Sequence, residues 1–206
     1  MKRACDFILS LVGLLLLSPV LLAIAAALKG SSPGPIVYRG LRVGRWGRPF
    51  HMLKFRTMVV EAERIGGSST ADDDPRITRV GKLLRKYKLD ELPQLINVLK
   101  GEMSLVGPRP EVPQYVAMFT NEEQLILAVR PGITDLASLW NADEGSFLAG
   151  SKDPEKTYLE VIRPNKIRLQ LEYVRRQSFV TDLQIIWKTV WTVLMRMVTK
   201  PRPSAG

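Results

Sequence analysis

The run from Phe7 to Leu28 contains no charged residue and constrains the fold more than any other part of the chain. A helix of about 20 apolar residues is long enough to cross a bilayer, so this run predicts a membrane element. Pro19 lies near its middle, where the missing N–H and the ring interrupt a regular helix. The adjacent Ser18 hydroxyl can satisfy a backbone group that the proline leaves free.

Basic residues flank the apolar run on both sides. The positive-inside rule places such flanks in the cytoplasm, and a single crossing cannot put both there. A re-entrant helix hairpin, which enters the bilayer and returns at Ser18 and Pro19, satisfies the rule. The basic flanking residues are Lys2, Arg3, Lys29, Arg39, Arg42, Arg45 and Arg48.

A signal peptide and an ordinary spanning helix are the alternative interpretations of this segment. A cleaved signal peptide would use Met1 to Arg3 as its basic region and Ala25 to Ala27 as its cleavage site, but the run is longer than a typical apolar core and contains a proline. An ordinary spanning helix conflicts with the two basic flanks. The re-entrant arrangement is therefore the prediction.

A chain of 206 residues suits one compact domain plus a membrane element. We expect a membrane-inserted re-entrant helix over residues 1–30 and a cytoplasmic, membrane-associated catalytic domain over residues 31–206. The net charge of +10 indicates anionic partners such as phosphates, acidic lipid headgroups or nucleic acid. Cys5 and His51 are the only residues of their types, which excludes an intrachain disulfide and a multi-histidine metal site.

The remaining pattern predicts a mostly helical α+β domain. Short strands at 36–38 and 50–55, joined through 44–49, form a β-hairpin. A basic helix covers 79–87. The last helix, 183–198, has two tryptophans and basic residues, which is typical of an amphipathic helix in the membrane interface. A core helix or a helix that forms a homodimer is the alternative.

Asp90 and Glu91 are adjacent carboxylates where a helix is expected to begin. Asp90 is a good N-cap, Pro93 is tolerated in the first turn, and Gly101 follows the end. Neighbouring side chains on a helix point about 100° apart, so one acid could attack a phosphorus while the other holds a metal. Acidic decoration of a helix start is the alternative. The expected apolar face consists of Leu92, Leu95, Ile96 and Leu99.

Four short motifs occur in order behind Ser18 and Pro19. Together they resemble the bacterial sugar transferase family, the monotopic phosphoglycosyl transferases of glycan assembly, through nearly the whole chain. The motifs are Lys54-Phe55-Arg56-Thr57-Met58, Leu89-Asp90-Glu91-Leu92-Pro93-Gln94, Ser104-Leu105-Val106-Gly107-Pro108-Arg109-Pro110 and Arg130-Pro131-Gly132-Ile133-Thr134.

The resemblance implies transfer of a sugar-1-phosphate from a UDP-sugar to polyprenyl (undecaprenyl) phosphate, with Mg²⁺ as cofactor. Asp90 matches the nucleophile, which would form a covalent aspartyl-phosphosugar and release UMP, and Glu91 matches the metal ligand. The reaction would be the first membrane step of glycan assembly. It would take place at the cytoplasmic face of the bacterial inner membrane, in contact with membrane lipid.

Four cations are candidates for binding the substrate phosphates. Arg109 lies between two prolines that stiffen its backbone, which suits a bidentate phosphate contact, and the family match places this region at the nucleotide. Lys54, Arg56 and Arg85 are the others; a solvated surface role is the alternative for each. The triplet Asp72-Asp73-Asp74 is expected to be solvated rather than metal-binding.

Two positions depart from the family pattern. Lys88 stands where members often have a small hydroxyl residue, and Gln170 stands where many have an acid. Either could alter donor choice or charge balance. The alternative function is a non-catalytic basic adaptor at the membrane surface. A nucleic-acid partner is not expected, because no zinc-finger, RNP or helix-turn-helix pattern is present.

Overall fold

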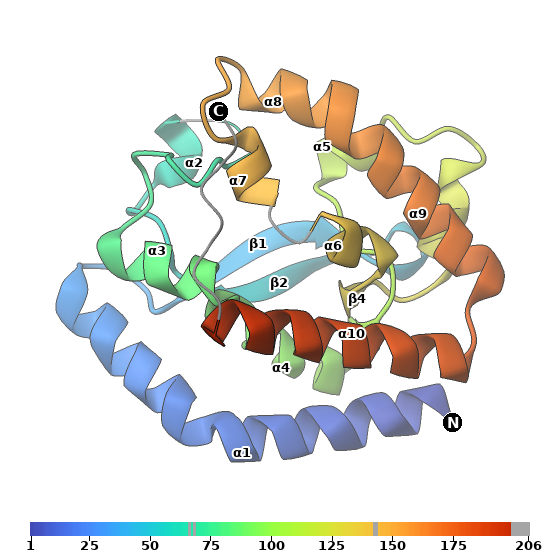
Figure 1. Ribbon diagram of the computed structural model, residues 1–206, viewed down its shortest axis with the longest axis horizontal. Helices are drawn as coiled ribbons and strands as arrows, with labels where there is room; N and C mark the ends of the chain where they lie inside the picture. Colours follow the sequence, from blue (N-terminus) through green and yellow to red (C-terminus); the bar gives the residue numbers. More distant parts are fainter. Residues whose placement is uncertain (66, 68, 142–143, 199–206) are drawn as a thin grey trace.

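The computed structural model describes residues 1–65, 67, 69–141 and 144–198. It is a mostly helical α+β protein with a long N-terminal apolar helix and two small sheets (Figure 1). The strands are β1 (Val37–Val43), β2 (Pro49–Phe55), β3 (Ser104–Val106) and β4 (Gly132–Thr134). The helices are α1 (Lys2–Ser31), α2 (Ala62–Ile65), α3 (Arg79–Lys86), α4 (Gln94–Lys100), α5 (Pro113–Val116), α6 (Leu136–Trp140), α7 (Glu144–Leu148), α8 (Pro154–Thr157), α9 (Arg163–Arg176) and α10 (Phe179–Val198).

α1 is one continuous helix with Pro19 inside it, and Figure 1 shows it bent. Pro19 has no N–H to donate to the carbonyl four residues earlier, that of Leu15. The Ser18 hydroxyl donates to that Leu15 oxygen at 2.8 Å, as the sequence predicted for a hydroxyl beside the proline. The expected helical hairpin is not seen within residues 2–31, because this bond lets the helix continue through the proline with a bend.

Both ends of α1 contact the rest of the domain. Near its start, the Arg3 guanidinium donates to the Val98 and Leu99 carbonyls at the end of α4 at 2.6 and 2.9 Å. Near its end, Ile24 and Leu28 are buried against Phe55 and Leu84. The helix is therefore fastened to one domain at two places.

The middle of α1 is apolar and exposed. By length and composition, α1 is a helix that could cross a membrane. Its exposed apolar residues are Phe7, Ile8, Leu9, Leu11, Val12, Leu15, Leu16, Val20 and Leu22.

The predicted β-hairpin is confirmed. β1 and β2 pair antiparallel, with Val37 opposite Phe55 and Val43 opposite Pro49. The Asn97 amide on α4 fastens the helix to β2: it accepts from the Leu53 N–H at 3.0 Å and donates to the His51 carbonyl at 2.8 Å. These two hydrogen bonds hold the segment before α4 beside Lys54 on β2.

β3 and β4 form a second, parallel pair with Ser104 opposite Gly132. The backbone segments around Gly107 and Gly132 approach very closely. A Cβ added at Gly107 would lie only 2.4 Å from the Arg130 carbonyl oxygen. A Cβ on Gly132 would lie 2.1 Å from the Gly107 nitrogen. Glycines at both positions therefore let the loop that carries Arg109 run against β4.

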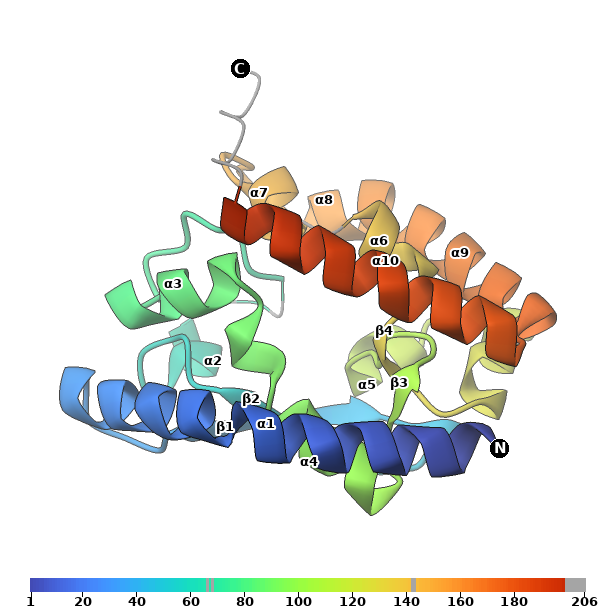
Figure 2. The same ribbon diagram turned by 60° about the horizontal axis from the view of Figure 1, so that its bottom comes forward.

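α9 and α10 form a second layer away from the hairpin, while α1 lies beside the hairpin and α4 (Figure 2). The predicted last helix is confirmed and begins a little earlier, at Phe179. Trp187 and Trp191 on α10 are 68% and 52% exposed, so this face is not part of the core. The Lys2 ammonium forms an ion pair with Asp182 near the start of α10 at 2.5 Å.

The prediction that Asp90 caps α4 is wrong. Asp90 lies in a separate 3-10 turn, Leu89–Glu91, and the N-cap of α4 is Pro93. Lys88 adopts a left-handed conformation (φ 56°) that ends the preceding helical segment. The buried face of α4 also differs from the expected one: it consists of Gln94, Asn97 and Val98, while Leu95 faces α1 at Gly13.

Candidate active site

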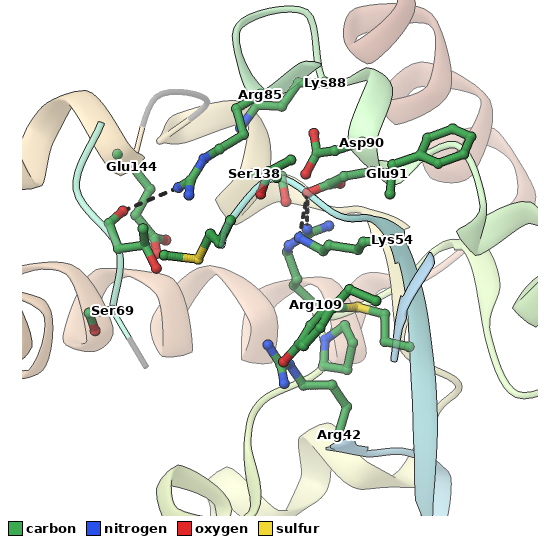
Figure 3. Close-up of a pocket in the computed structure, with 18 of the residues that line it drawn as sticks. Arg42, Lys54, Ser69, Arg85, Lys88, Asp90, Glu91, Arg109, Ser138 and Glu144 are labelled. Atoms are coloured by element: carbon green, nitrogen blue, oxygen red, sulfur yellow. Dashed lines mark hydrogen bonds and ion pairs between the residues drawn. The ribbon is translucent and has the colours of Figure 1, made fainter. Parts of the chain in front are cut away.

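The turn Leu89–Glu91 presents its two acids to a cleft between the hairpin, α3 and the α6–α9 layer. The cleft has a volume of about 2050 Å³. Figure 3 shows Lys54, Asp90, Glu91 and Arg109 close together, with Arg42, Arg85 and Glu144 further along its walls. These side chains come from segments far apart in the sequence, which the hairpin and the β3–β4 pair hold together.

Glu91 is the centre of an ion-pair network. Its Oε1 accepts from the Lys54 ammonium at 3.0 Å and from the Arg109 guanidinium. Burial would raise the pKa of the Glu91 carboxyl, but the Arg109 and Lys54 charges outweigh it and hold that pKa well below its usual range. Glu91 is therefore ionised at neutral pH.

Asp90 has a different environment. It is only 6% exposed, and its Oδ1 has no hydrogen-bond partner among the residues that the structure describes. Burial raises the pKa of the Asp90 carboxyl, although the nearby Lys54 charge opposes the shift. A buried polar atom without a partner is costly, so this oxygen is suited to an incoming ligand or reacting atom.

Arg109 and Lys54, two of the four cations predicted to bind substrate phosphates, both contact Glu91. The second guanidinium nitrogen of Arg109, Nη1, donates to the Ile133 carbonyl at 2.8 Å, which aims the side chain along β4. Burial lowers the pKa of the Lys54 ammonium, while Glu91 opposes the shift. Both cations line the cleft and can face a phosphate.

Arg85 and Arg56 are placed apart from this centre. Arg85 lines the cleft and donates to the Thr70 carbonyl at 3.3 Å, so it lies on the wall opposite Arg42 (Figure 3). Arg56 also borders the cleft, but its guanidinium donates to the Pro35 and Ser32 carbonyls at 2.7 and 2.9 Å. Arg56 thus secures the end of α1 rather than joining the Glu91 network.

A second ion pair with little exposure also lines the cleft and was not identified from the sequence. The Lys166 ammonium pairs with Glu111 at 2.6 Å, and the Tyr158 hydroxyl donates to the same carboxylate at 2.8 Å. Lys166 and Glu111 are 55 residues apart by numbering, and Glu111 follows the Pro108-Arg109-Pro110 motif directly. The helical spacing of Tyr158 and Lys166 was the only available signal, and it does not name Glu111.

The donor set fits a divalent cation at Glu91. Among the described residues there is no group of three His, Cys, Asp or Glu side chains that could hold a metal ion, and this includes the Asp72-Asp73-Asp74 run. Mg²⁺ does not need such a group, because it usually takes one or two carboxylates, substrate phosphate and water. The ionised Glu91 carboxylate supplies one such donor.

The sequence model of the bacterial sugar transferase family matches residues 1–196. The chain belongs to this family. The resemblance predicted from the four motifs is thereby confirmed.

Curated relatives of this family member carry related names. A protein of Aeromonas hydrophila, UDP-N-acetylgalactosamine-undecaprenyl-phosphate N-acetylgalactosaminephosphotransferase, is 38% identical over 94% of this chain and 43% of its own length. The UDP-glucose:undecaprenyl-phosphate glucose-1-phosphate transferase of Escherichia coli (strain K12) is 40% identical over 93% of this chain and 39% of its own length. The exopolysaccharide production protein ExoY of Sinorhizobium fredii is 34% identical over 94% of this chain and 85% of its own length. The chain therefore spans about two fifths of the first two relatives.

Proposed function

We propose that this protein transfers a sugar-1-phosphate from a UDP-sugar to undecaprenyl phosphate through a covalent intermediate on Asp90. The proposal rests on Asp90 Oδ1, which is buried and has no hydrogen-bond partner among the described residues. It lies beside a Glu91 carboxylate that Lys54 and Arg109 already neutralise. The names of the Aeromonas and Escherichia relatives, which specify UDP-sugars and undecaprenyl phosphate, support the choice of substrates.

In the first step, an Asp90 carboxylate oxygen attacks the sugar-bearing phosphorus of the donor. The bond between this phosphorus and the bridging oxygen breaks, and UMP leaves with the electron pair. A carboxylate nucleophile must be ionised, and Lys54 favours the ionised form of Asp90. Arg109 and Lys54 would balance the charge that builds up on the leaving phosphate.

In the second step, a phosphate oxygen of undecaprenyl phosphate attacks the same phosphorus. The bond between Asp90 and phosphorus breaks, the carboxylate is regenerated, and undecaprenyl diphosphate sugar is the product. Neither step needs a net proton transfer. This is consistent with a site built from cations and carboxylates, because the chain's single histidine, His51, is exposed on β2 and does not line the cleft.

Mg²⁺ is the cofactor that we propose, held by the Glu91 carboxylate. When bound, it would neutralise negative charge on the phosphates of the donor. Lys54 and Arg109 share only one Glu91 oxygen, Oε1, in the contacts described above. The rest of that carboxylate remains the natural place for the cation.

We further propose that the protein acts at the cytoplasmic face of the inner membrane, with α1 entering the bilayer and returning. Arg3 at one end of α1 and Leu28 near the other both contact the same domain. A helix that crossed the bilayer completely would carry these ends to opposite faces. The exposed apolar middle of α1, together with Trp187 and Trp191, would then lie in lipid and bring the acceptor headgroup to the cleft.

The direct test is release of UMP. Purified full-length chain in lipid nanodiscs is incubated with Mg²⁺, undecaprenyl phosphate and a panel of UDP-sugars. We expect UMP release with at least one donor, loss of release in Asp90→Asn, and normal release in Glu160→Gln, which removes an exposed acid. Binding to acidic vesicles without any nucleotide turnover would instead favour the membrane adaptor.

A further inference from the structure

The backbone of Arg109 is held at both of its polar groups by side chains from other elements. Its N–H donates to Asp135 Oδ2 at 3.1 Å, and its carbonyl oxygen accepts from Gln170 Nε2 at 3.3 Å. Pro108 and Pro110 on either side have no N–H and a fixed φ. The single backbone donor of this tripeptide is therefore used by Asp135.

Asp135 and Gln170 also bind each other. Gln170 Nε2 donates to Asp135 Oδ2 at 3.1 Å, and the side chains are buried, with exposures of 1% and 0%. Asp135 Oδ1 accepts from the Ser138 N–H at 2.6 Å as the N-cap of α6. The three groups form a closed ring in which the Gln170 amide serves both Asp135 and Arg109, so each member fixes the other two.

We infer that Asp135 and Gln170 are positioning residues that hold Arg109 at the Glu91 centre. Neither of them touches the cleft end of the guanidinium, which bonds to Ile133 and Glu91. They act through the backbone of Arg109, and a bidentate phosphate contact depends on how that backbone directs the side chain. This inference rests on the proposed function for its kinetic consequence.

The ring also requires an amide at position 170. A carboxylate there would lose both hydrogen-bond donors and would place a second negative charge beside Asp135. Two buried carboxylates in contact repel, so this end of the ring would open and release the Arg109 carbonyl. Asp135 supplies the carboxylate of the ring, and the Gln170 amide supplies the hydrogen-bond donor to it.

The test uses Gln170→Glu and the uncharged Gln170→Met. Gln177→Glu is the matched control, because Gln177 is exposed just after α9. Two readouts are measured on full-length protein: the rate at which phenylglyoxal modifies Arg109, by peptide mass spectrometry with Arg42 as internal reference, and the KM for UDP-sugar against kcat.

We expect Arg109 to be modified several-fold faster in Gln170→Glu and Gln170→Met, while Arg42 is unchanged. The KM for UDP-sugar should rise about tenfold in Gln170→Glu, the equivalent of one lost buried hydrogen bond. Gln177→Glu should match wild type in both readouts. An unchanged Arg109 modification rate in both single variants would overturn the inference. If no UDP-sugar is turned over by wild type, the proposed function fails, while the modification rates still decide this inference.

Discussion

Asp90 and Glu91 are neighbours in the chain, but only Glu91 has its charge balanced by direct ion pairs. Glu91 Oε1 accepts from Lys54 and Arg109, whereas Asp90 Oδ1 is buried without a hydrogen-bond partner in the part of the chain that the structure describes. This difference is the physical basis for giving the two acids separate roles, nucleophile and cation ligand.

Replacing Glu91 should damage both activity and stability. Glu91→Gln leaves Lys54 and Arg109 facing each other without the carboxylate between them. Breaking a buried pair costs about 3–5 kcal/mol, and the lower end is expected because the Glu91 side chain is 16% exposed. UMP release should fall roughly 10²-fold. Activity and thermal unfolding are compared with Glu160→Gln, which removes an exposed acid; a fully active and stable Glu91→Gln would refute both roles.

The pH dependence of the rate should follow Asp90 rather than Glu91. Burial raises the pKa of Asp90, whereas the Arg109 and Lys54 charges keep that of Glu91 low. The nucleophile must be ionised, so kcat falls as the pH falls through the raised Asp90 pKa, while Glu91 stays charged. Lys54→Met removes the charge that opposes the shift, so this acid limb should move to higher pH. The limb is measured against Lys152→Met, and a limb that stays in place or moves down would count against the assignment.

Arg56 offers a choice between two roles. Its guanidinium donates to the Pro35 and Ser32 carbonyls, and the residue is only 5% exposed. If it anchors α1, Arg56→Leu should lower the free energy of unfolding by about 1.5–3 kcal/mol, the value of hydrogen bonds to a charged group. The KM for UDP-sugar should not change in the folded fraction. A raised KM with unchanged stability would support the phosphate contact predicted from the sequence.

The bend in α1 should determine the topology of the chain. Replacing Ser18 by Ala and Pro19 by Leu restores the regular hydrogen bond to the Leu15 carbonyl, so α1 should straighten and span the membrane. Cys5 reports the position of the N-terminal end, and Gly30→Cys in a Cys5→Ser background reports the other end. A Cβ at Gly30 meets nothing within 4 Å.

An impermeant thiol reagent is applied to intact and to opened cells. In the wild type, both positions should be labelled only after opening. In the Ser18→Ala, Pro19→Leu variant, position 5 should be labelled in intact cells. Labelling of Cys5 in intact wild-type cells would mean that α1 already spans, and the re-entrant arrangement would be wrong.

The sequence predicted the elements that depend on local pattern. The β1–β2 hairpin, α3 and α10 follow from periodicity and turn residues, and the role of Ser18 follows from the chemistry of proline. The pairing of Lys54 and Arg109 with Glu91 was not derivable from spacing, because it depends on the Asn97 contacts to β2 and on the close approach of Gly107 and Gly132. The motifs indicated which residues matter, but not which of them touch.

The errors have identifiable causes. Asp90 and Pro93 match a helix start locally, but the left-handed Lys88 and the following 3-10 turn delay α4 to Gln94. The leucines of α4 were expected to face the core, whereas Leu95 faces α1 and the polar Asn97 is buried because it bonds to β2. Gln170 stood out only as a departure from the family pattern, and nothing in the sequence linked it to Asp135, since their contact is formed only when α6 and α9 pack together.

The covalent intermediate is the most direct test of the central claim. Protein is mixed with UDP-sugar and Mg²⁺ in the absence of undecaprenyl phosphate, quenched rapidly, and examined by intact and peptide mass spectrometry. We expect one added sugar phosphate on Asp90, one UMP released per adduct, and no adduct in Asp90→Asn. Addition of undecaprenyl phosphate should remove the sugar phosphate from Asp90. An adduct on another residue, or UMP release that requires the acceptor and leaves no adduct, would contradict it.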